Sequence, residues 1–68
     1  MTRFEYAIVE AKVFGGFEIE YPDRQEKVKG ELIGILNRLG QEGWELVSTT
    51  SDQMGNPQKL FLKRVHGG

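Results

Sequence analysis

The sequence contains no cysteine, and this absence sets the first limits on what the 68-residue chain can be. Disulfide bridges and thiolate metal sites are excluded. A chain of this length buries only about 60% of the surface that its unfolded form exposes, so its stability is marginal unless something adds to it. Because disulfides cannot make that contribution, we expect association between subunits to make it.

Long apolar runs and an excess of one charge are also missing. No stretch approaches the roughly 20 apolar residues that cross a bilayer, and residues 1–5 lack the apolar run of a signal peptide. Nine basic and ten acidic side chains give a formal net charge of -1, so the chain has no general attraction to nucleic-acid phosphates or anionic lipids. We expect a soluble, cytoplasmic protein of one domain, residues 1–68, that binds neither membrane nor long nucleic acid.

The residues that are present predict two strands at the start of the chain. Residues 3–14 are rich in aromatic and β-branched side chains and contain no Gly or Pro, which is typical of a long strand. Phe4, Tyr6 and Ile8 lie on one face of this strand and Val9 on the other, so it either carries a bulge or is covered on both faces. A second strand, residues 17–21, alternates strictly.

A three-residue loop, Phe14-Gly15-Gly16, is predicted to join these strands in a hairpin. This register sets Val13 opposite Phe17 and Lys12 opposite Glu18. A two-residue loop would instead pair apolar with acidic side chains, which favours the longer loop.

A helix is expected after this hairpin. Asp23 lies three residues before Glu26, a variant of the capping box in which two side chains satisfy free amides at a helix start. Gly40 is predicted to end the helix as a left-handed cap. Between them, apolar residues recur at the spacing of one helical face; they are Val28, Leu32, Ile35, Leu36 and Leu39.

Two further strands complete the predicted fold. They cover residues 44–50 and 59–65, and the loop between them contains the turn Gly55-Asn56-Pro57. The fold class is therefore α+β, in the order ββαββ, with a single helix packed on one face of a four-stranded antiparallel or mixed sheet. The second face stays partly apolar, and an exposed patch of that kind usually marks an interface.

Five residues are candidates for this interface: Val9, Gly30, Gly34, Val47 and Phe61. Val9, Val47 and Phe61 are predicted on the second face of the sheet. Gly30 and Gly34 lie one turn apart on the predicted helix, where each glycine costs up to about 1 kcal/mol relative to alanine. Their presence indicates either simple tolerance or a close contact between helices in an oligomer.

A small basic patch is the candidate site for an anionic ligand. Lys59 and Lys63 share one strand face with Phe61, and Lys12 can approach them. Basic side chains around an aromatic ring are typical of sites that bind anions or bases. One such patch in each subunit suits a small ligand better than a long nucleic acid.

The other titratable residues give no catalytic site. His66 is the single histidine, and no partner for a metal site or a general base is predicted beside it. Four glutamates can approach one another across the hairpin, but such groups are usually solvated side chains of a sheet face; they are Glu5, Glu10, Glu18 and Glu20. We therefore expect no enzyme activity, no metal and no cofactor.

Three blocks of the sequence carry a resemblance to a known family. The chain opens with Phe4-Glu5-Tyr6, residues 36–47 contain Gly40-Gln41-Glu42-Gly43-Trp44, and residues 60–64 form the closing strand. In these blocks the chain resembles the family called domain of unknown function 4177. The resemblance implies a fold and small bacterial or phage-type relatives, and it carries over no catalytic or binding residue.

Trp44 is the most distinctive residue of these blocks. We predict that its ring seals the helix against the sheet and that its indole amide reaches a loop carbonyl. Gly40 and Gly43 flank this connection and are predicted to be turn glycines.

Three functions remain open. The leading hypothesis is a non-enzymatic protein-interaction module that forms a homo-oligomer through its second sheet face or its helix and offers a surface to a protein partner. The alternative is a protein that binds or sequesters a small ligand, such as a nucleotide, in pockets between subunits. The third is a ubiquitin-like or sulfur-carrier protein that uses Gly67-Gly68, although only His66 separates these glycines from the last predicted strand.

Overall fold

The chain forms five strands and one helix among its described residues. The computed structural model describes residues 2–13, 15–55 and 57–66. The elements follow the order β1 (Phe4–Ala11), β2 (Phe17–Glu20), β3 (Gln25–Val28), α1 (Leu32–Gln41), β4 (Glu45–Ser51) and β5 (Pro57–Val65).

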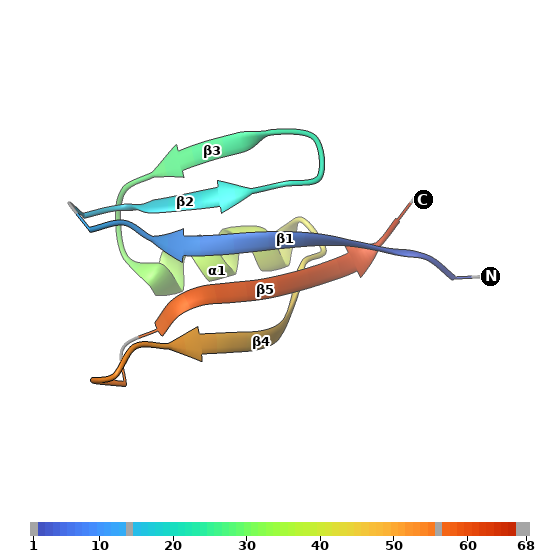
Figure 1. Ribbon diagram of the computed structural model, residues 1–68. Helices are drawn as coiled ribbons and strands as arrows, with labels where there is room; N and C mark the ends of the chain where they lie inside the picture. Colours follow the sequence, from blue (N-terminus) through green and yellow to red (C-terminus); the bar gives the residue numbers. More distant parts are fainter. Residues whose placement is uncertain (1, 14, 56, 67–68) are drawn as a thin grey trace.

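The strands form one antiparallel sheet in the order β3-β2-β1-β5-β4. Figure 1 shows α1 on one side of this sheet, behind it in that view. The first and last strands, β1 and β5, are neighbours in the middle, and the bond from the His66 amide to the Arg3 carbonyl, 2.8 Å long, extends their pairing. The α+β class with one described helix is confirmed, whereas the predicted four strands in ββαββ order are wrong by one strand.

The additional strand, β3, occupies the region predicted as the first turns of the helix. The Tyr21 amide donates to the Arg24 carbonyl at 2.7 Å, so Pro22 and Asp23 turn the chain back along β2. The pairs Glu20↔Gln25, Glu18↔Lys27 and Phe17↔Val28 then continue the sheet. Backbone pairing with β2 outweighs the weak local preference of this charged segment for helix, so the predicted capping box does not form.

Gly30 separates β3 from the helix. Its φ of +122° is a conformation that residues with a Cβ rarely adopt, and it ends the extended chain before α1 begins at Leu32. Gly30 is therefore not on the helix, and the predicted stripe shared by Gly30 and Gly34 does not exist. Gly34 is a helical residue with open space where a Cβ would lie.

The helix ends in a Schellman motif around Gly43, not at Gly40 as predicted. The Trp44 amide donates to the Leu39 carbonyl and the Gly43 amide to the Gly40 carbonyl, both at 3.0 Å. Gly43 has φ +95°, the left-handed conformation that this motif needs just after the helix. Gly40 lies one residue before the helix end at Gln41.

The first hairpin closes one residue earlier than predicted. Lys12 and Gly16 share the last bond of the hairpin, from the Lys12 amide to the Gly16 carbonyl at 3.1 Å, and Ala11 pairs with Phe17. The expected pairing of Val13 with Phe17 is therefore wrong, and Phe14 lies outside the described residues. The observed register sets Val9 opposite Ile19, two side chains with 0% exposure, so core packing selects it.

The core lies between the sheet and α1. Its buried side chains come from the strands, the helix and the connection after the helix; they are Ala7, Val9, Ile19, Tyr21, Ile35, Leu39, Trp44, Leu60 and Leu62. The Trp44 ring is 4% exposed, and its centroid lies 6.2 Å from that of Tyr21. The predicted core role of Trp44 is confirmed.

Candidate interaction surface

The side of the sheet opposite the helix is not covered by any described element, and we call it the open face. Successive residues of a strand point to opposite sides, so the residues between the buried positions of β1 and β5 lie on the open face. These strands contribute Phe4, Tyr6, Ile8, Glu10, Lys59, Phe61, Lys63 and Val65.

An apolar stripe runs along the middle of the open face. It consists of Phe4, Tyr6, Ile8, Phe61 and Val65, in which Phe4 pairs with Val65 and Ile8 with Phe61. Phe4, Tyr6 and Val65 are 44%, 60% and 61% exposed. Three large apolar side chains that share one sheet face form a contiguous patch, and such patches on small proteins mark sites of association.

Charged side chains flank the apolar stripe at one end. Glu10 lies at the centre of this group, with Lys12 Nζ 3.0 Å from its Oε1 and Lys59 Nζ 3.7 Å from its Oε2. The hydrogen bond from Lys12 lowers the pKa of Glu10 below its usual value. Glu18 pairs with Glu10 across β1 and β2, and Lys12 Nζ, 3.5 Å from Glu18 Oε1, offsets the repulsion between the two carboxylates.

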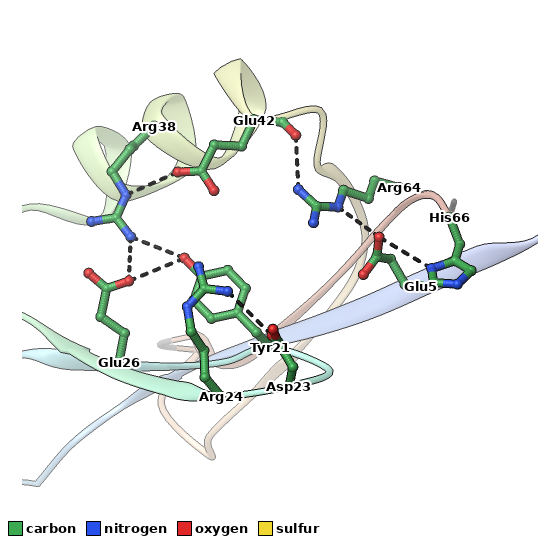
Figure 2. A network of polar contacts seen from close by, with 9 residues as sticks. All are labelled: Glu5, Tyr21, Asp23, Arg24, Glu26, Arg38, Glu42, Arg64 and His66. Atoms are coloured by element: carbon green, nitrogen blue, oxygen red, sulfur yellow. Dashed lines mark hydrogen bonds and ion pairs between the residues drawn. The ribbon is translucent and has the colours of Figure 1, made fainter. Parts of the chain in front are cut away.

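A second polar group joins the helix to β3 on the other side of the sheet (Figure 2). Arg38 donates to Glu26 Oε1 at 2.8 Å and to the Tyr21 hydroxyl at 3.1 Å. The hydrogen bond from Arg38 lowers the pKa of Glu26. Arg24 lies over the Tyr21 ring, 3.9 Å from its centroid. The contacts of Arg38 therefore join α1 to Tyr21 and β3.

Arg64 forms the second half of the contacts drawn in Figure 2. Its guanidinium lies 4.3 Å from the centroid of the Trp44 ring, donates to the Glu42 carbonyl at 3.2 Å and donates to Glu5 Oε2 at 3.1 Å. It therefore satisfies a carbonyl at the helix end and covers the indole. The Trp44 indole Nε1 is buried without a hydrogen-bond partner among the described residues, so the predicted bond to a loop carbonyl is wrong.

The comparison with protein families matches residues 4–64 to the model described as Domain of unknown function (DUF4177). The chain belongs to this family. No curated protein and no solved structure matched the chain. The family resemblance predicted from the sequence is thus confirmed.

The structure explains the most distinctive block of this DUF4177 chain. Gly43 and Trp44 occupy the two positions of the Schellman motif that follow the helix, and Trp44 packs into the core directly after it. The block therefore ends a helix and anchors the connection to β4. This is a structural role, and none of these residues lies on the open face.

The five predicted interface residues fall in different places in the DUF4177 fold. Phe61 lies in the apolar stripe. Val9 has 0% exposure and points into the core, because it occupies the opposite side of β1 from Ile8. Val47 is 53% exposed at a bulge in the edge strand β4. Gly30 and Gly34 lie behind the sheet, at the start of α1.

The three lysines of the predicted anion patch are already engaged. Lys12 and Lys59 both contact Glu10, as described above, and Lys63 Nζ lies 4.7 Å from the centroid of the Phe4 ring. Lys59 and Lys63 are on the open face. They form the basic half of a mixed surface in which acidic and basic side chains alternate.

The predicted glutamate group is divided between the two sides of the sheet. Glu5 points to the helix side. There its Oε2 forms an ion pair with Arg64 and lies 3.6 Å from His66 Nδ1. Glu10, Glu18 and Glu20 lie on the open face and line a hollow of about 50 Å³ with Ile8 and Lys59. Gly67 and Gly68, the proposed carrier tail, lie outside the described residues.

The open-face residues Phe4, Tyr6, Ile8 and Val65 are missing from the predicted interface. The sequence does place the first three on one face of a strand, and this alternation is the available signal. It is not sufficient, because strand order decides whether a neighbouring strand adds Phe61 and Val65 beside them.

Two further observations on the described residues bear on function. No group of three or more His, Asp or Glu residues with metal-binding geometry occurs in the described part of the chain. No helix among the described elements is long and apolar enough to span a membrane.

Proposed function

We propose that this protein is a non-enzymatic protein-interaction module that self-associates through the open face of its sheet. The observation that carries the proposal is the apolar stripe, in which Tyr6 is 60% and Val65 61% exposed on a face that no described element covers. Removing such surface from water stabilises an assembly by about 25 cal/mol for each Å² buried.

The composition of the stripe supports this role. Aromatic side chains are enriched at the centres of protein interfaces, where they contribute most of the binding energy. Phe4, Tyr6 and Phe61 provide three of them within two neighbouring strands. The charged groups around Glu10 lie beside the stripe, as the polar rim of an interface does.

Association also provides the stability that a cysteine-free chain of this size needs. Binding between native subunits stabilises the folded state by mass action. The core holds nine buried side chains behind the sheet, and covering the open face would bury a second apolar layer. The same surface would then serve both folding and recognition.

The proposal is tested by comparing Tyr6→Lys with Ile33→Lys. Tyr6 is 60% exposed on the open face and Ile33 is 62% exposed on the helix, so the two substitutions remove apolar groups of similar exposure from opposite sides. Tyr6→Lys is expected to weaken the dimer at least about tenfold, a loss of about 1.4 kcal/mol. Ile33→Lys is expected to leave it unchanged. Sedimentation equilibrium over a concentration series measures both.

Three outcomes contradict the proposal. If the wild-type chain stays monomeric at all concentrations, self-association is ruled out. If Tyr6→Lys and wild type have equal dissociation constants, the open face is not the interface. If only Ile33→Lys weakens the dimer, the interface lies on the helix.

A further inference from the structure

The open face is arranged in rows that cross the strands, because paired residues lie side by side. Four rows run across the middle strands β1 and β5, and none of them sets two like charges side by side. Two rows pair apolar side chains, one pairs a carboxylate with an ammonium group, and one pairs Tyr6 with a lysine whose ammonium group lies over the neighbouring Phe4 ring; they are Phe4↔Val65, Ile8↔Phe61, Glu10↔Lys59 and Tyr6↔Lys63.

We propose that two copies of this chain pack open face to open face about a twofold axis that runs parallel to the strands, along the boundary between β1 and β5. This inference rests on the proposed self-association and adds the identity and orientation of the partner. Rotation about this axis places β1 of one copy over β5 of the other, and each row then faces the same row of the second copy. Ile8 then faces Phe61 of the second copy, and Glu10 faces Lys59 of the second copy.

The neighbouring strands fit the same axis. The rows continue outward from Ile8 to Glu20 on β2, and from Phe61 to Ser48 on β4. The axis places β2 over β4, so Glu20 faces Ser48 of the second copy. In the next row Glu18 faces Thr50 of the second copy. In both rows a hydroxyl group can donate a hydrogen bond to a carboxylate.

An axis that runs across the strands gives the opposite result. It places every strand over its own counterpart. Wherever the two β2 strands overlap, Glu18 and Glu20 face carboxylates of the second copy, and an axis at the row of Ile8 and Phe61 also sets Lys59 over Lys63 of the second copy. Like charges facing each other across an interface cost binding energy. The distribution of charge on the open face therefore favours the axis parallel to the strands.

The packing distance suits the side chains of the open face. Four of the five strands overlap across the proposed axis, and β3 lies outside the contact. Two sheets that pack with their strands nearly aligned lie about 10 Å apart and differ in direction by about 30°. Side chains of the size of Tyr6 and Phe61 fill that space.

Two charge-reversal variants, Glu10→Lys and Lys59→Glu, test the arrangement. Their side chains are 37% and 50% exposed in the wild type, so neither change disturbs the core. In a homodimer of either variant, the proposed contact joins two like charges. In a mixed dimer both copies of the contact join opposite charges, whereas the repulsion within each chain stays the same. The mixture therefore separates the interaction between the two open faces from the repulsion within each chain.

The two variants are mixed in equal amounts, one of them isotope-labelled, and the dimers are counted by native mass spectrometry. We expect the mixed dimer to exceed its statistical share of one half and the excess to shrink at high salt. A statistical mixture overturns the proposed axis if the wild-type chain is dimeric, and it leaves self-association in place. A monomeric wild-type chain overturns both proposals.

Spin labels give a second test that uses no charge change at the contact. The chain has no cysteine, so Lys27→Cys on β3 and Thr49→Cys on β4 each accept one label. With strands about 4.8 Å apart and sheets about 10 Å apart, the proposed axis separates the two copies by about 26 Å at position 27 and about 18 Å at position 49. A crossed axis at the row of Ile8 and Phe61 would instead give about 17 Å at position 27 and about 12 Å at position 49, and two such short distances indicate that axis. A very short distance at Thr49 with a much longer one at Lys27 indicates edge pairing of β4, and either result overturns the proposal.

Discussion

Trp44 shows how one side chain connects three parts of the molecule. Its amide completes the Schellman motif, its ring contacts the core beside Tyr21, and Arg64 covers its outer face. Its indole N–H has no partner among the described residues. The contribution of this side chain to stability therefore comes from packing and not from hydrogen bonding.

This packing role predicts a small effect for Trp44→Phe. The substitution removes part of the ring and no hydrogen bond, so we expect it to lower the free energy of unfolding by about 1 to 2 kcal/mol, less than Leu39→Ala, for which about 2 to 5 kcal/mol is expected. Urea unfolding followed by circular dichroism measures both. If Trp44→Phe costs more than Leu39→Ala, the indole N–H makes a stabilising bond after all.

Glu26 gives a prediction for pH. The hydrogen bond from Arg38 lowers the pKa of Glu26 in the folded state, so the pair stabilises the fold above the unfolded pKa of about 4.3, and the contribution is lost as the pH falls through the folded value. Because both side chains are more than one third exposed, Glu26→Gln is expected to cost only about 0.2 to 1 kcal/mol at pH 7.

The measurement for Glu26 is the free energy of unfolding of wild type and Glu26→Gln at pH 7 and at pH 3. The difference between the two proteins should shrink towards pH 3, because the contribution of the wild-type carboxylate is lost as the pH falls through its lowered folded-state pKa. A difference that stays constant between the two pH values would show that Glu26 contributes through its shape or its contacts and not through its charge.

At the scale of elements, the two glycines Gly30 and Gly34 should respond in opposite ways to the same change. At each of them, no atom lies within 4 Å of the point that an added Cβ would occupy, so steric clash plays no part. Gly30→Ala forces a Cβ into φ +122° and is expected to destabilise the fold by about 1 to 3 kcal/mol. Gly34→Ala improves helix propensity and is expected to stabilise it by up to about 1 kcal/mol.

Thermal unfolding of the two alanine variants tests this pair. The midpoint should fall for Gly30→Ala and rise for Gly34→Ala. A fall for both would mean that Gly34 is needed for a close contact of the helix, as the interpretation of an oligomer through helices requires.

The sequence predicts most elements of the fold but not all of their boundaries. Alternation predicts β1, β2 and β5, because one side of each strand faces the core, whereas β4, whose residues are all exposed, is predicted from its β-branched residues. Alternation fails at β3, where Glu26, Lys27 and Val28 fit helical spacing as well as strand spacing. The pairing with β2 that decides between them comes from the rest of the molecule. A glycine inside a helical pattern, as Gly30 is, can indicate that the helix does not include that residue.

The candidate surface depends even more on long-range pairing. Local alternation places Phe4, Tyr6 and Ile8 on one side of β1, but only the sheet order brings Phe61 beside them. The predicted side of Val9 is wrong. From the sequence alone, β1 could either contain a bulge or be covered on both faces, so the side on which Val9 lies is not determined. In the structure β1 pairs with β5 without a bulge, so the same side of the strand faces the core along this pairing.

At the scale of the whole molecule, self-association predicts that stability depends on concentration. A tenfold rise in protein concentration should raise the wild-type Tm by about 3 to 6 °C while the dimer predominates. Tyr6→Lys should show a smaller shift, because its subunits dissociate before they unfold. Differential scanning calorimetry at several concentrations measures both proteins, and a wild-type Tm that does not change with concentration contradicts the proposed dimer.

The central position of β1 and β5 also has a consequence for the growing chain on the ribosome. β1 is made early but pairs along one whole edge with β5, the last strand described. During synthesis, the hairpin of β1 and β2 therefore exposes an unpaired edge and the aromatic side chains of β1 until residues 57–65 emerge. The sheet therefore cannot close before β5 emerges, and a nascent chain stalled before β5 is the form most prone to aggregate.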